Sequence, residues 1–186
     1  MKINLPGLIC AVVLGLTGLQ KASAQGASYQ KLTPDDFQGM PRTNGDGVVA
    51  YTNCTIDFHY EANPKDNYYL LKFDIKVTMN RNRSWMNRTM IKSQDQLAEI
   101  LRHEQGHYTI AYMEQQELLR TVGKTVFYAN YRQQAQEIFD RIDAKYKQLN
   151  LDYDADTEHM VNRVQQASWN AYFDKKLAYM PPVNED

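Results

Sequence analysis

Two histidines and a glutamate occur close together in the run His103-Glu104-Gln105-Gly106-His107. If this run is helical, residues four apart share a face, so His103 and His107 can direct imidazole nitrogens at one metal ion. Glu104 then lies beside the metal, within reach of a bound water but outside the ligand set. Zinc lowers the pKa of bound water to about 7, and a neighbouring carboxylate can take the proton. The pattern predicts a zinc hydrolase in which Glu104 is the general base.

The sequence around this motif has the signals of a helix over residues 93–122. Ser93 and Gln96 fit a capping box at its start. Apolar residues then recur at three- and four-residue spacing, and Gly123 suits the end of the helix. Gly106 costs about 1 kcal/mol in a helix interior relative to Ala, so we expect it to permit close approach of another segment or of substrate.

A catalytic zinc normally has three protein ligands and one open position, so the third ligand must come from another segment. His59 falls on the polar side of a predicted strand and is interpreted as a surface histidine. His159 falls at a predicted helix start capped by Asp156 or Thr157. Because partial positive charge at a helix start disfavours imidazolium, His159 would be neutral there and is the preferred third ligand.

Other polar residues compete with His159 or support it. Asp154 lies five residues before it and is a candidate to accept a hydrogen bond from the ring N–H of His159 that does not face the metal. Tyr153 and Tyr108 are candidate phenolic donors to the transition-state oxyanion, and Tyr153 is preferred because its segment leads into His159. Three carboxylates of the next predicted helix could each complete a two-histidine, one-carboxylate site instead: Glu137, Asp140 and Asp143.

Four stretches carry a family resemblance: LTPDDFQG at 32–39, SW at 84–85, HEQGHY at 103–108 and YDADTEH at 153–159. In these the chain resembles the bacterial family catalogued as domain of unknown function 922, whose members are described as predicted secreted zinc-dependent proteases. The resemblance implies that His103, His107 and His159 are the metal ligands and that Glu104 is the catalytic acid/base. Met160 departs from the pattern, because a small residue such as Gly is expected there, and this puts the local backbone path in question.

The first 24 residues have the pattern of a secretory signal peptide, with Lys2, an apolar stretch and the small residues Ala22-Ser23-Ala24. The mature chain is then expected to begin at Gln25 and to form a single domain, residues 25–186, in the periplasm or outside the cell. Cys10 has too little apolar sequence before it for a lipoprotein anchor. Cys54 is left without a disulfide partner and is expected to be a buried small hydrophobe.

The charge of the chain argues against several kinds of partner. Its 186 residues carry a formal net charge of −1, with 21 basic and 22 acidic residues interspersed. Such a pattern has no polybasic footprint for nucleic acid or anionic lipid. No run after the predicted signal peptide is long and apolar enough to span a membrane.

The order of the predicted elements favours an α+β, zincin-like fold. Two strand-like runs, residues 48–60 and 69–79, are separated by Asn63-Pro64-Lys65-Asp66-Asn67, which suits a turn between antiparallel strands. Helical segments follow near residues 93–122, 127–149 and 157–177, with Val161 and Val164 among the core positions of the last. We therefore expect a small antiparallel sheet followed by three helices, with the motif on the first helix.

These observations predict an exported zinc metallopeptidase that hydrolyses peptide bonds with zinc-activated water. A strand before the motif helix could offer its edge to an extended peptide substrate. The alternative is a non-catalytic exported protein, a degenerate peptidase that keeps zinc for binding or structure. A purely structural zinc site would be closed by four protein ligands and would not need Glu104. Amidase chemistry on cell-wall peptides would use the same residues.

Overall fold

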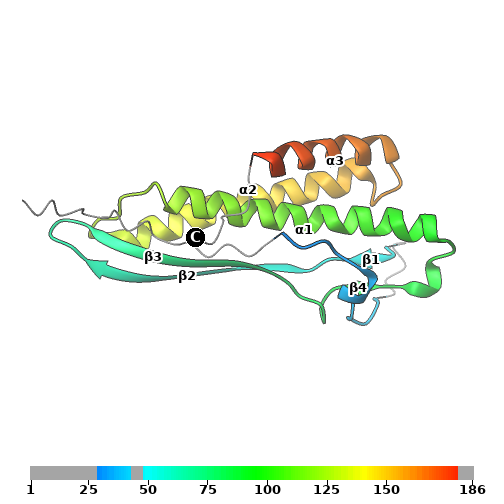
Figure 1. Ribbon diagram of the computed structural model, residues 1–186, viewed down its shortest axis with the longest axis horizontal. Coiled ribbons are helices and arrows are strands. Elements are labelled where there is room, and N and C mark those ends of the chain that lie inside the picture. The colour runs from blue at the N-terminus through cyan, green and yellow to red at the C-terminus, as the bar shows by residue number, and fades with distance from the viewer. Residues whose placement is uncertain (1–28, 43–47, 180–186) are drawn as a thin grey trace, which may run out of the picture.

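One long helix forms the centre of the molecule. The computed structural model describes residues 29–42 and 48–179, so the predicted signal peptide and Cys10 lie outside the described residues. Helix α1, Gln94–Val122, packs against a β-hairpin on one side and against helices α2, Tyr131–Thr157, and α3, Arg163–Ala178, on the other (Figure 1). The predicted α+β class is confirmed, and so is the order of a small antiparallel sheet followed by three helices.

The hairpin consists of strands β2, Cys54–Pro64, and β3, Tyr69–Met79, which pair antiparallel along their whole length. Cys54 lies opposite Met79, and Pro64 lies opposite Tyr69. In β3 the odd-numbered residues are buried or half-buried and the even-numbered residues are exposed, as the alternation of apolar and polar residues predicts. The apolar face of the hairpin packs on α1, and Ile75 is fully buried there.

A second, very short sheet lies near the open end of the hairpin, where Cys54 and Met79 pair. Strand β1, Ala50–Tyr51, pairs antiparallel with β4, Trp85–Met86. Two 3₁₀ turns flank this region, η1 at Pro34–Asp36 and η2 at Arg88–Met90. Together with residues 29–32, these segments cover the first half of α1, where a second apolar cluster contains Leu32, Ile100 and Tyr108.

Helix α1 begins where the capping pattern predicts. The Ser93 hydroxyl accepts a hydrogen bond from the backbone N–H of Gln96 at 3.1 Å. The Gln96 side chain accepts from the backbone N–H of Lys92 at 2.7 Å, one residue earlier than a regular capping box requires. The helix runs without interruption to Val122, so the motif residues 103–107 lie in its interior.

The predicted boundary between the second and third helices is wrong. Helix α2 continues through Thr157 instead of ending near residue 149, and α3 begins at Arg163 with Asn162 as its N-cap. The extension is stable because Tyr153 and Thr157 are fully buried on the side of α2 that faces α1. Val161 and Val164, expected in the core, are 72% and 76% exposed because they lie at the connection and the first turn of α3.

Three consecutive non-glycine residues leave α2 with positive φ: Glu158 at 47°, His159 at 51° and Met160 at 81°. Met160 is the position where the family resemblance implies a small residue, and its φ lies in the region that favours glycine. Within residues 29–42 and 48–179, no helix combines the length and the apolar character that a membrane span requires.

Candidate metal centre

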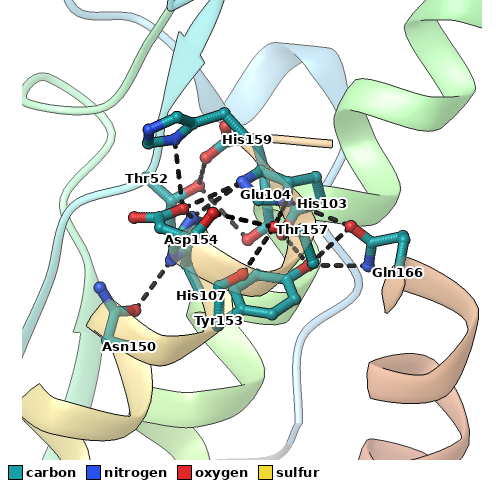
Figure 2. Close-up of polar contacts among 10 residues, drawn as sticks. All are labelled: Thr52, His103, Glu104, His107, Asn150, Tyr153, Asp154, Thr157, His159 and Gln166. Carbon is teal, nitrogen blue, oxygen red and sulfur yellow. Dashed lines mark hydrogen bonds and ion pairs between the residues drawn. The ribbon is translucent and has the colours of Figure 1, made fainter. Parts of the chain in front are cut away.

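Three potential ligand atoms meet between α1 and α2. The Nε2 atoms of His103 and His107 lie 3.2 Å apart, and Asp154 Oδ1 lies 3.3 Å from the first and 3.1 Å from the second (Figure 2). Within the described part of the chain, these three residues form a group whose ligand atoms all lie within 4.8 Å of one another and could hold a metal ion.

The other nitrogen of each imidazole determines which tautomer faces this centre. His107 Nδ1 lies 2.8 Å from Asn150 Oδ1, and His103 Nδ1 lies 3.1 Å from Gln166 Oε1. An amide oxygen only accepts hydrogen bonds, so each Nδ1 must carry the proton. In their neutral forms both imidazoles therefore direct the Nε2 lone pair to the centre, which is the state that metal coordination requires.

The electrostatics of the centre favour bound positive charge. Burial alone would lower the pKa of His107, but the carboxylates of Asp154 and Glu104 outweigh burial and raise it to about 9. Burial alone would raise the pKa of Asp154, but the two neighbouring imidazoles hold it well below its usual range. The buried group thus attracts a cation, either a proton or a metal ion.

The donor set fits a divalent metal. Asp154 Oδ1 is buried, yet no described residue offers it a correctly oriented hydrogen-bond donor. Two imidazole nitrogens and one carboxylate oxygen are ligands that zinc accepts, and three protein ligands leave one coordination position open. A metal ion between the three atoms would satisfy all of them at once.

Glu104 is held beside this group by a threonine from outside the helix. Its side chain is only 3% exposed, and its Oε2 accepts a hydrogen bond from the Thr52 hydroxyl at 2.6 Å. Thr52 directly follows strand β1, so the sheet region fixes the orientation of the carboxylate. Figure 2 shows Glu104 next to His103 and Asp154, pointing toward Thr52.

The two middle residues of the motif, Gln105 and Gly106, contact neighbouring segments. Gln105 donates to the backbone carbonyl of Gln30 at 3.0 Å and accepts from the backbone N–H of Leu32 at 2.7 Å, which anchors the segment before η1. Gly106 faces the Tyr153 ring, and a Cβ on Gly106 would lie 2.7 Å from Tyr153 Cε1 and closer still to Cζ and the hydroxyl oxygen. The close approach expected at Gly106 is therefore made by an aromatic side chain.

Tyr153 is not positioned as the expected oxyanion donor. It is fully buried, stacks on the His103 ring with centroids 4.8 Å apart, and donates its hydroxyl to the His103 carbonyl at 2.9 Å. Its hydroxyl is also joined to Gln166, and its side chain does not border the adjoining cleft. Tyr153 therefore holds the His103 ring in place by stacking and by its hydrogen bond to the His103 carbonyl. Tyr108, the other candidate, is also buried, and its hydroxyl accepts from the backbone N–H of Gln30.

Asp154 lies where the sequence suggested the third ligand, His159, and His159 lies beside Asp154. His159 follows the end of α2, so the partial positive charge of a helix start is absent there. Its side chain is 63% exposed, and its Nδ1 lies 3.4 Å from Asp154 Oδ1 rather than inside the group of three ligand atoms. Asp154, expected behind His159, is the residue that meets both motif histidines. His59 is exposed on β2, as expected.

An open cleft of about 840 Å³ leads to these residues. Its floor is the face of α1 that carries His103, Glu104 and His107. Residues 48–56 form one wall, and the α2 residues between 139 and 154, followed by His159 and Met160, form the other. A molecule lying in this cleft would contact the candidate metal centre directly.

Residues that support the centre were missed by sequence reasoning. Thr52, Asn150, Thr157 and Gln166 come from three separate segments, and none belongs to a recognisable motif. One signal was available for α2, because Asn150, Tyr153, Asp154 and Thr157 have the three- and four-residue spacing of one helix face. The predicted helix ended near residue 149, so this shared face was not recognised.

Comparison with known proteins agrees with the resemblance. The family model described as "Bacterial protein of unknown function (DUF922)" matches residues 20–160, which include both the motif and Asp154. Neither the curated proteins nor the solved structures contain a significant match to the chain. A match over this share of the sequence shows that the chain belongs to the DUF922 family of bacterial proteins.

Proposed function

We propose that this protein is an exported zinc-dependent peptidase. One observation carries the proposal: the ligand atoms of His103, His107 and Asp154 converge beside the buried carboxylate of Glu104, at the floor of an open cleft. A structural zinc site would be closed by a fourth protein ligand, whereas this group has three and adjoins a space that could admit substrate.

In this proposal each residue has a separate task. Bound zinc would activate a water molecule and polarise the carbonyl of the scissile peptide bond. Glu104 takes the proton of the attacking water and passes it to the leaving amine, while the Thr52 hydroxyl holds the carboxylate in place. Asn150 and Gln166 keep the imidazoles of His107 and His103 in the tautomer that binds metal.

Two features support an extended peptide as the substrate. Strand β2 pairs with β3 along one edge, and no other strand of the described residues pairs with it. Residues 54–56 of β2 also border the cleft. An extended peptide could therefore add to this edge by backbone hydrogen bonds and lie across the metal centre.

Metal binding is tested first, by the zinc content of the purified protein after dialysis against metal-free buffer. We expect about one zinc per chain, lost in Asp154→Ala and kept in Asp152→Ala. Asp152 is a matched control because it lies on the same helix, is exposed and accepts a hydrogen bond from Gln148, away from the metal group. His159→Ala should keep the metal with a modest loss of affinity. Zinc retention in Asp154→Ala but not in His159→Ala would reverse this ligand assignment.

Hydrolysis is tested with a mixture of quenched fluorescent peptides. Glu104→Gln keeps the shape of the side chain and should keep zinc, but it should lower the cleavage rate by at least about 100-fold because the general base is gone. Equal cleavage rates for wild type and Glu104→Gln would refute the mechanism. A stoichiometric zinc content without cleavage of any peptide would favour the non-catalytic alternative.

A further inference from the structure

The cleft continues along α1 beyond the metal centre and reaches a second acidic position. Glu114 lies seven residues after His107 and borders the same cleft, with Ile110 and Ala111 between them. Seven residues are about two helical turns, so Glu114 lies roughly 10 Å further along the helix axis. This distance separates it from the proposed chemistry but keeps it within reach of the same bound peptide.

Glu114 is a buried carboxylate with one oxygen that lacks a hydrogen bond. Its side chain is 7% exposed, and among the described residues nothing makes a hydrogen bond to its Oε1. Burial, with a smaller contribution from the charge of Asp143, raises the pKa of Glu114 to about 7. A buried charge without a partner opposes folding, and a neutral side chain of the same size would avoid that cost.

The charges around Glu114 leave room for one more cation. Asp143 and Lys147, both on α2, border the same part of the cleft. Lys147 Nζ pairs with Asp143 Oδ2 at 2.8 Å, and the Lys147 side chain is 74% exposed. One lysine therefore accompanies two carboxylates: Lys147 pairs with Asp143 and offsets the charge of Glu114 only in part.

The other residues of this part of the cleft suit the stem of a long basic side chain. Ile56 of β2 and Phe139 of α2 face the cleft from opposite walls, and Ile110 contributes to the floor. Lysine and arginine place their methylene groups along such apolar surfaces while the charged end meets a polar partner. A carboxylate enclosed by apolar walls is a suitable partner for that charged end.

We propose that Glu114 forms a specificity subsite for a lysine or arginine side chain of the peptide that occupies the cleft. This inference rests on the proposed peptidase function. An extended peptide advances about 3.3 Å per residue, so a separation of roughly 10 Å corresponds to about three residues. The preferred peptide carries a basic residue about three positions from the bond that lies over the metal centre.

Binding can be measured without cleavage. The zinc-loaded Glu104→Gln protein is titrated, by fluorescence polarisation, with labelled nine-residue peptides of Ala and Gly that each carry one Arg at a different position. We expect one Arg position to bind at least tenfold more tightly than the all-Ala/Gly peptide. The gain should fall below twofold when Glu114→Gln is added. It should persist when Glu117→Gln is added instead, because Glu117 does not border the cleft and is paired with Lys145.

The outcomes separate this subsite from the peptidase proposal. An Arg preference that survives Glu114→Gln, or equal binding of all the peptides, would overturn the subsite and leave the peptidase proposal standing. Cleavage of peptides by the protein with Glu104 intact, without any Arg preference in cleavage rate, would do the same. Failure of every peptide to bind or to be cleaved would overturn both. Circular dichroism of each variant verifies that the comparison is made between folded proteins.

Discussion

The close contact between Gly106 and Tyr153 allows a quantitative test of how the two helices hold the metal centre. In an ordinary helix interior, replacing Gly with Ala stabilises the helix by about 1 kcal/mol. At Gly106 the new methyl group would lie within 3.0 Å of three atoms of Tyr153, a separation that real Cβ atoms essentially never show. The substitution Gly106→Ala therefore tests packing against intrinsic helix propensity.

The Tyr153 ring cannot easily move away from the added methyl group. It is fully buried, its hydroxyl donates to the His103 carbonyl at 2.9 Å, and Gln166 Nε2 donates to that hydroxyl at 2.8 Å. Overpacking of this kind typically costs about 1–3 kcal/mol. After subtraction of the gain in helix propensity, we expect Gly106→Ala to lower the free energy of unfolding by up to about 2 kcal/mol. For a chain of this size, that corresponds to a fall in Tm of roughly 4–8 °C.

Urea and thermal unfolding of six proteins would measure this effect: wild type, Gly106→Ala, the single variants Tyr153→Phe and Tyr153→Leu, and the two double variants that combine each of these with Gly106→Ala. Tyr153→Phe removes the hydroxyl oxygen but keeps the ring carbons Cζ and Cε1 that also meet the methyl group, so it should relieve only part of the clash. Tyr153→Leu removes the ring, so the two substitutions should show a favourable coupling energy, with each Tyr153 single variant completing its cycle. A Gly106→Ala protein more stable than wild type by about 1 kcal/mol would refute the close packing described here.

Two further predictions concern charge and capping. Burial and the charge of Asp143 raise the folded-state pKa of Glu114 from its usual 4.5 to about 7, and Lys147 opposes the rise. Ionisation of Glu114 therefore costs stability as pH rises from 4.5 to 7. Glu114→Gln should therefore stabilise the fold at pH 8 by up to about 3 kcal/mol and much less at pH 4, which urea titrations at the two pH values would measure. Ser93→Ala removes the acceptor for the Gln96 N–H at the start of α1 and should cost about 1 kcal/mol, whereas an unchanged urea midpoint would show that this cap contributes nothing.

The hairpin and the central helix could be predicted from sequence because their signals are local. Alternating side chains in β3 and the Ser93 cap of α1 each report on neighbouring residues of the same element. The third member of the metal group could not be ranked in the same way. Asp154 meets His103 and His107 only because α2 extends past residue 149, and that extension depends on packing against another helix.

Asn150 to Thr157 contains residues that favour turns and caps when they are considered alone, including three aspartates and an asparagine. Tertiary packing outweighs that preference. Tyr153 fills the space left by Gly106, and the Thr157 hydroxyl donates to the Tyr153 carbonyl within the last turn of α2. Considered alone, Gly106 weakens helix α1 and the polar run weakens helix α2. In the folded protein the two segments meet, because Gly106 leaves room for the Tyr153 ring.

Several features that cost stability lie along the cleft. Glu114 Oε1 and Asp154 Oδ1 are buried and have no correctly oriented donor among the described residues. Glu158, His159 and Met160 hold positive φ angles that non-glycine residues seldom adopt, and His159 and Met160 border the same cleft. Backbone strain of this kind costs of order 1 kcal/mol or more per residue and persists only where the surrounding structure imposes it. Selection for folding alone would remove such costs, so the buried carboxylate oxygens of Glu114 and Asp154 are a physical reason to expect cationic ligands at both positions.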